Sequence, residues 1–208
     1  RKTLQDSQNV AIVLSETKIA TVTNTTINGV AFRYTTVAWP TSGYHVLTVN
    51  YYDDYNFPNA PIIPSTVETQ AVYYNGTVKP KGLSTGSWVR VPETSALYKS
   101  ETSYTLYDYK ARVIRSYTQN HLGGYTYTDN KLNTFTGQVA YTMTRHKRLQ
   151  GDAELLTKEA FTYSDQDRLM THTHQINGGE IQLLASNSYD VLGQLISKGI
   201  GNTAVYPL

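Results

Sequence analysis

One short pattern recurs four times in the second half of this chain of 208 residues. Each copy combines an aromatic residue, usually a carboxylate or hydroxyl residue, two variable residues, a turn-permitting residue, a basic or amide residue and an aliphatic residue. The copies are residues 107–113, 133–139, 163–169 and 189–195, and their first residues lie about 26, 30 and 26 positions apart. Spacings in this range are typical of repeat architectures. The chain is therefore expected to fold as an array, and its function is expected to belong to that array.

Each copy is interpreted as the corner of a β-hairpin. An Asp at the first position of a four-residue turn accepts a hydrogen bond from the backbone two residues later, and a Gly at the fourth position supplies a positive φ. The aromatic residue then ends the incoming strand and the aliphatic residue begins the outgoing one. Two copies have Ala111 and Asp167 at the position of positive φ, where an Ala costs about 1 kcal/mol. The residues expected to build the corners are Tyr107, Asp108, Arg112, Phe135, Gly137, Tyr163, Asp165, Arg168, Tyr189, Asp190 and Gly193.

These corners resemble the YD-repeat, or RHS-repeat, family, whose signature combines Tyr-Asp with Gly-Arg. Residues 161–197, which include the run at 172–179, are similar to a pair of such units, and residues 47–55, 81–86 and 120–124 resemble degenerate ones. In that family, many units form a spiral strip that closes into a hollow shell, and some shells enclose a toxic cargo domain. The resemblance implies a non-enzymatic structural segment of a large bacterial protein that is secreted or displayed at the cell surface. Its partners would be neighbouring repeats of the same parent chain and an encapsulated cargo domain.

Composition agrees with an all-β fold. The chain has 18 Tyr but no Cys and only 2 Met, so it is rich in strand formers and poor in helix formers. We predict an array of antiparallel β-hairpins that forms an open, curved and twisted sheet, because four or five units are too few to close a shell. An unpaired sheet edge is a template for association, so edge-to-edge self-association is also expected.

Two regions are predicted along the chain. Residues 1–100 form a β-rich segment of degenerate repeats with a Pro-bearing loop at 57–64, and residues 101–208 form the hairpin array. In the first region, tight hairpins are expected at Asn28-Gly29 and Asn75-Gly76. Further strands there are expected at 10–14, 19–23, 46–52 and 87–91. The array should pair 103–107 with 112–118, 125–132 with 138–145, 155–163 with 168–175, and 182–189 with 194–197, although 155–160 also suits a helical turn.

Charge and motifs favour no enzyme, cofactor or nucleic-acid partner. The net charge of +2 is spread along the chain, and residues 145–148 form only a short basic cluster. No apolar stretch of spanning length and no signal peptide is seen, and a chain that begins at Arg1 is expected to be an excised piece. His172 and His174 have a spacing that two metal ligands can use, but no Cys is present to assist them. The acidic residues of the pair Asp53-Asp54, and Asp165 with Asp167, are assigned to turns rather than to acid and base catalysis.

An alternative function is surface binding of glycans, as in an adhesion module. Trp39, Trp88 and the numerous Tyr residues offer planar rings that stack on sugars when they face solvent. The same rings also suit packing within strands. Two or three coplanar exposed rings would favour binding, whereas rings packed between repeats would favour a wall.

Overall fold

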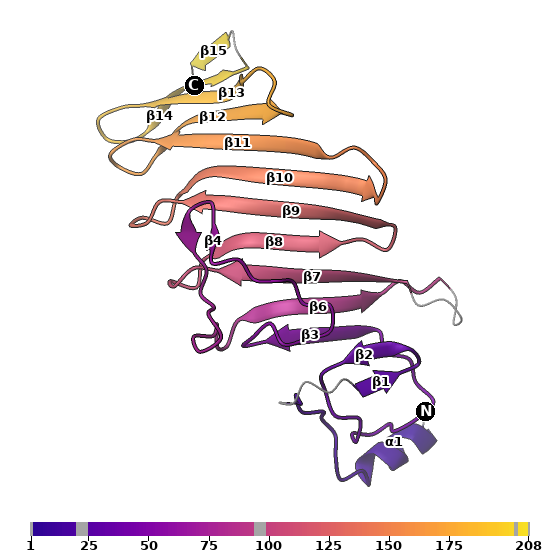
Figure 1. Ribbon diagram of the computed structural model, residues 1–208. Helices are drawn as coiled ribbons and strands as arrows, with labels where there is room; N and C mark the ends of the chain where they lie inside the picture. The colour runs from indigo at the N-terminus through magenta and orange to yellow at the C-terminus, as the bar shows by residue number, and fades with distance from the viewer. Residues whose placement is uncertain (1, 20–24, 94–98, 202–203, 208) are drawn as a thin grey trace. The chain divides into compact units, whose positions relative to one another are not determined.

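The computed structural model describes residues 2–19, 25–93, 99–201 and 204–207, and for 204–207 it describes the backbone alone. Within this part of the chain there is one helix, α1 (Lys2–Asn9), and the remaining elements are strands (Figure 1). The strands are β1 (Thr25–Ile27), β2 (Val30–Phe32), β3 (Thr48–Tyr52), β4 (Thr66–Val67), β5 (Gln70–Ala71), β6 (Ser84–Arg90), β7 (Ser100–Tyr107), β8 (Val113–Gln119), β9 (Gly123–Leu132), β10 (Val139–Leu149), β11 (Leu155–Tyr163), β12 (Leu169–Ile176), β13 (Gln182–Tyr189), β14 (Leu195–Ile200) and β15 (Ala204–Pro207).

Eleven strands form one antiparallel sheet, in the order β15-β14-β13-β12-β11-β10-β9-β8-β7-β6-β3. From β6 to β15 each strand neighbours the next one in the chain, and the sheet is not closed. The predicted all-β array of antiparallel hairpins is confirmed. The segment 155–160 is part of β11 rather than a helical turn.

The chain divides into two compact units, Arg1–Ile63 with Pro80–Tyr104, and Pro64–Lys79 with Thr105–Leu208. The first unit has an aromatic core in which the ring of Tyr51 stacks on Phe57 with centroids 4.6 Å apart. Gly86 of β6 lies under that ring, because a Cβ at this position would approach the Phe57 ring to 2.5 Å. The glycine therefore permits the close packing of Phe57 onto the sheet.

Several expectations for the first unit are confirmed. β1 and β2 pair around Asn28-Gly29, both with positive φ, as a tight hairpin requires. Strands β3 and β6 lie within or beside the predicted segments, and 57–64 contains no strand. The expectation of a strand at 10–14 is wrong, because that stretch follows α1 and its side chains at Ile12 and Leu14 are exposed without a neighbouring strand. Of the strand expected at 19–23, residues 20–23 lie outside the described residues.

In the second unit, the hairpin predicted at Asn75-Gly76 is wrong. Strands β4 and β5 pair instead around Glu68 and Thr69, which have φ of 47° and 64°. The Asn75 Oδ1 accepts backbone hydrogen bonds from Thr77 at 3.2 Å and from Val78 at 2.8 Å. This side chain closes a local turn, so the Asn-Gly pair makes a corner without flanking strands.

Candidate functional site

Three of the four repeated corners share one backbone geometry. In each of these three, the first polar residue donates its N–H to the carbonyl four residues later at 2.9 Å, and the residue of positive φ donates back at 2.9 to 3.0 Å. The first residues are Asp108, Ser164 and Asp190, and the residues of positive φ are Ala111 (60°), Asp167 (64°) and Gly193 (87°). These three corners are thus the same turn built from different side chains, as the sequence predicts.

The remaining corner, at residues 133–139, is one residue longer. Asn133 donates to the carbonyl of Gln138 at 2.7 Å, five residues later, and Gly137 has φ of 82°. Leu132 therefore ends the incoming strand, while Phe135 lies in the turn and is 89% exposed. Phe135 was expected to occupy the aromatic position of the repeat, and the extra residue displaces it from there.

The first polar side chain closes each corner from within. Asp108 Oδ1 accepts the N–H groups of Lys110 and Arg112, each at 2.9 Å, and its Oδ2 accepts the Arg112 Nε at 2.7 Å. Burial raises the pKa of Asp108, but the hydrogen bonds from Arg112 and Lys110 outweigh burial and hold this pKa below its usual value. At the third corner, Ser164 rather than Asp165 takes this place, and its Oγ accepts the N–H of Arg168 at 3.2 Å.

The basic or amide residue that follows each of the first three corners along the chain reaches forward to the next corner. Arg112 Nη1 donates to the carbonyl of Asn133 at 3.1 Å, and Gln138 Nε2 donates to the carbonyl of Asp167 at 3.2 Å. Arg168 continues the series, since its guanidinium fills the space in front of Gly193. A Cβ on Gly193 would lie 1.6 Å from the Arg168 Nη2. Glycine at this corner therefore has two functions: it adopts the positive φ, and its lack of a side chain leaves space for the guanidinium of Arg168.

Two of the tyrosines that end an incoming strand reach backward. The hydroxyl of Tyr163 donates to the carbonyl of Val139 at 3.1 Å, and that of Tyr189 donates to the carbonyl of Leu169 at 2.9 Å. Each acceptor is the first residue of the strand that leaves the preceding corner. Arg168 also lies 5.7 Å from the centre of the Tyr189 ring, within the range of a cation–π contact. The Tyr, Arg and Gly of the repeat thus join one corner to the next, and we name this set of contacts the corner ladder.

Sequence reasoning found most of the residues of the corner ladder but not their contacts. The presence of glycine in the repeat was explained only by its positive φ, and that of tyrosine only by its preference for strands. The roughly constant spacing of the basic residue after each turn was the available signal for the forward contact.

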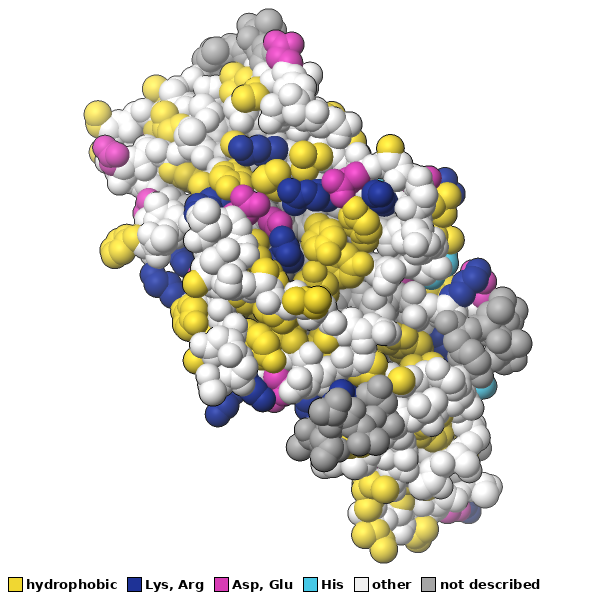
Figure 2. Space-filling model, in the orientation of Figure 1, with side chains coloured by type: hydrophobic (Ala, Val, Ile, Leu, Met, Phe, Trp, Pro, Cys, Tyr) yellow, Lys and Arg dark blue, Asp and Glu magenta, His cyan; other side chains and the backbone are white. Residues whose placement is uncertain are grey.

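A second cluster lies on strands β8, β9 and β10. Asp129 is only 1% exposed and accepts two hydrogen bonds from Arg115, at 2.6 and 2.7 Å, while the Arg145 Nη1 lies 3.5 Å away. Over these strands, basic and acidic side chains are interspersed with hydrophobic ones (Figure 2). The two arginines compensate the buried carboxylate, so this cluster is a structural ion-pair network.

The tyrosines beside this network do not form a flat platform. The rings of Tyr117, Tyr125 and Tyr127 lie 4.5 to 6.3 Å apart at angles between 32° and 77°. The Tyr125 hydroxyl donates to Glu154, and this hydrogen bond, with burial and the Glu154 charge, raises the pKa of Tyr125 to about 12. The rings therefore pack against one another instead of presenting coplanar faces.

Glycan stacking would need Trp39 and Trp88 to face solvent, but both are half-buried. Trp39 borders a cavity of about 460 Å³ beside α1, and Trp88 lies in β6 opposite Val49 and Thr102. Neither ring stands free of its surroundings as a stacking surface for a sugar.

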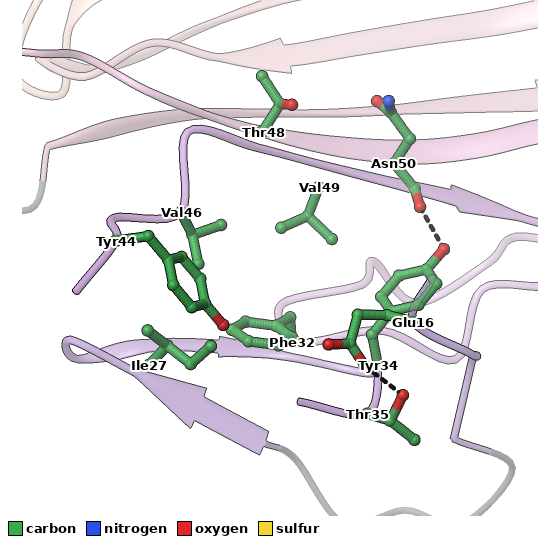
Figure 3. A pocket seen from close by; sticks show the side chains of 10 residues that line it. All are labelled: Glu16, Ile27, Phe32, Tyr34, Thr35, Tyr44, Val46, Thr48, Val49 and Asn50. Carbon is green, nitrogen blue, oxygen red and sulfur yellow. Dashed lines mark hydrogen bonds between the residues drawn. The ribbon is translucent and has the colours of Figure 1, made fainter. Parts of the chain in front are cut away.

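The first unit also holds a pocket of about 260 Å³ (Figure 3). Ten residues line it: Glu16, Ile27, Phe32, Tyr34, Thr35, Tyr44, Val46, Thr48, Val49 and Asn50. Burial raises the pKa of Glu16, but hydrogen bonds from the Thr35 hydroxyl and the N–H groups of Ala38 and Val37 lower it below the usual value. The carboxylate is thus engaged in holding the local chain, and the pocket is smaller than the usual range for ligand sites of about 300 to 1,000 Å³.

The histidine and acidic residues considered as metal ligands or catalysts contact other side chains and the backbone. His172 stacks on Phe161 with ring centroids 4.6 Å apart, and its Nε2 lies 3.5 Å from a carboxylate oxygen of Glu159. Within the described residues, no group of three or more His, Asp or Glu side chains is arranged to hold a metal ion. Asp53 accepts the N–H of Gly82 at 2.7 Å, and Asp54 pairs with Lys18. Among the described residues, no helix has the length and apolar character that crossing a bilayer requires.

A scan against protein-family models finds no family that matches the chain. A search of curated proteins likewise finds no match.

Proposed function

We propose that this chain is a non-enzymatic wall segment of a large secreted or cell-surface protein of the YD-repeat type. The corner ladder is the observation that carries this proposal. The residues that define the repeat in the sequence are those whose side chains contact the neighbouring repeat, through Arg112, Gln138 and Arg168 forward and Tyr163 and Tyr189 backward. The polar groups of these side chains bind the neighbouring repeat rather than a substrate, as in other repeat proteins whose units contact only their neighbours.

The burial of the array also favours a wall. None of the residues of β10, β11, β12 and β13 is fully buried, and most are half-buried. A solitary globular domain of this size normally buries one sheet face under a second layer. A sheet whose faces are both partly open suits a partition between an interior, which holds cargo, and the surrounding solvent.

Electron microscopy of the complete parent protein tests this proposal. The expected particle is a hollow shell whose wall contains residues 105–208, and a parent that lacks these residues should give an incomplete shell. A deletion of equal length in a region outside the repeats is the matched control. A compact particle without an interior, or a parent without further repeats, would overturn the proposal.

Glycan recognition makes a different prediction for the isolated chain. A binding module of this kind would need flat exposed rings, and neither the half-buried Trp39 and Trp88 nor the tilted tyrosines favour it. We expect a glycan array to give no signal above that of a Trp88→Ala variant. Selective binding that this variant abolishes would favour the alternative.

A further inference from the structure

One edge of the sheet is covered by side chains. Among the described strands, β3 pairs with β6 alone, and its other edge carries the carbonyls of Asn50 and Tyr52. The Tyr34 hydroxyl donates to the Asn50 carbonyl at 2.5 Å, and the Lys18 Nζ donates to the Tyr52 carbonyl at 2.8 Å. Residues two apart on a strand direct their carbonyls to the same side, so both contacts close the same edge.

The two donors are placed by a short backbone bridge. Lys18 and Tyr34 are direct antiparallel partners. The Ile19 N–H donates to the Arg33 carbonyl at 3.0 Å, and the Thr35 N–H donates to the Thr17 carbonyl at 2.9 Å. Because side chains of directly opposed residues lie on the same face, the bridge presents both donors together.

Further contacts hold each donor at the edge. Lys18 Nζ forms an ion pair with Asp54 at 2.7 Å, and both side chains are largely buried. The Tyr34 ring stacks on Tyr51 with centroids 5.8 Å apart (Figure 3 shows Tyr34 and its bond to Asn50). Burial, followed by the nearby Tyr52, Asp53 and Asp54, raises the pKa of Tyr34 further above neutral pH, where a tyrosine hydroxyl is already protonated and able to donate.

The segment that carries the donors is braced as well. Glu16 precedes the bridge and accepts hydrogen bonds from the Thr35 hydroxyl and from the N–H groups of Val37, at 3.1 Å, and Ala38, at 2.7 Å. The contact between Glu16 and Thr35 lies beside that between Tyr34 and Asn50 in Figure 3. The donors therefore belong to an ordered element and not to chance surface side chains.

We propose that residues 16–19 and 25–35 form an end cap that closes the β3 edge against the addition of another strand. An incoming strand needs the carbonyls of Asn50 and Tyr52 as acceptors for its own N–H groups, and the cap occupies both. Repeat arrays require such caps at their ends, because an open end propagates or aggregates. The partner that the cap excludes is a second copy of this chain, whose β3 offers the same edge in antiparallel orientation. This inference holds whether or not the chain is part of a shell wall.

The test removes the two donors and leaves the chain otherwise intact. The variant is Lys18→Met with Tyr34→Phe. The control, Lys198→Met with Tyr109→Phe, deletes the same atoms from exposed side chains outside β3 and its neighbour β6. Because the chain has no cysteine, Leu47→Cys, at a position 59% exposed beside β3, accepts one spin label in every version.

Dipolar coupling between labels on different molecules reports association at this edge, and sedimentation velocity reports its strength. The uncapped variant should show coupling and a dimer dissociation constant at least about tenfold lower than the wild type. The wild type and the control should show no coupling. Coupling in the wild type, or an uncapped variant that behaves as the wild type does, would overturn the proposal. If the double variant does not fold, Tyr34→Phe alone should show the same change to a smaller degree, and its absence counts equally against the cap.

Discussion

Replacing Gly193 by Ala tests the corner ladder most directly. The backbone there has φ of 87°, which costs an L-residue about 1 kcal/mol. The new Cβ would also meet the Arg168 guanidinium, whose Nη2 lies 1.6 Å from its position. The arginine must then move, and it loses a contact with the Tyr189 ring that is worth about 0.5 to 1 kcal/mol. We expect a total loss of about 2 kcal/mol.

Gly178→Ala is the matched control, because Gly178 has φ of 71° and open space around it. That substitution should cost about 1 kcal/mol, from the backbone alone. Urea unfolding followed by circular dichroism measures both losses, and hydrogen exchange of residues 182–200 locates the first. In an Arg168→Ala background, Gly193→Ala should cost no more than the control. Equal costs for the two glycines in the natural background would show that the arginine contact contributes nothing.

Three further predictions concern single corners. Ala111→Gly should stabilise the chain by up to about 1 kcal/mol in urea unfolding, because Ala111 already has φ of 60°; a loss of stability would contradict the strain. Tyr189→Phe should lose about 1 kcal/mol with its backward hydrogen bond, whereas Tyr109→Phe, at an exposed tyrosine, should change little. Asp108→Asn should destabilise the chain by about 1 to 3 kcal/mol at neutral pH through the loss of the Arg112 pair. The folded pKa of Asp108 lies below its usual 3.8, so this contribution is full above that value and is lost as the pH falls through the folded pKa. Unfolding midpoints measured from neutral to acid pH should therefore converge for Asp108→Asn and the wild type, and a constant difference would argue against the pair.

Local sequence rules predicted the array well because its turns are decided locally. The positive φ at Gly137, Asp167 and Gly193, and even at Ala111, follows from the position of each residue in a four- or five-residue corner. The hairpin strands follow from alternation and from these corners. Tertiary contacts overrode the local signal at Asn75-Gly76, where the segment joins β7 through the bond from the Tyr73 N–H to the Tyr107 carbonyl at 2.7 Å.

Contacts between side chains distant in sequence were beyond prediction. Lys18 and Tyr34 carry no motif, and only the folded chain brings them to the carbonyls of β3. Whether Trp39 and Trp88 face solvent stayed open at the level of sequence for the same reason, since composition does not tell which face of a strand is covered. The ion pair of Asp129 with Arg115 is visible only once β8 and β9 are in register.

The strand order of the second unit bears on how the protein is made. From β8 to β15 every strand neighbours its successor. Each hairpin can therefore form as soon as its two strands have left the ribosome, without waiting for later segments. The segment with β4 and β5 is the exception, because Gln70 bonds the backbone of Asn130, 60 positions further on. Translation must therefore deliver β9 before the segment with β4 and β5 can dock. This early segment reaches its final place only after the strands up to β9 have been made.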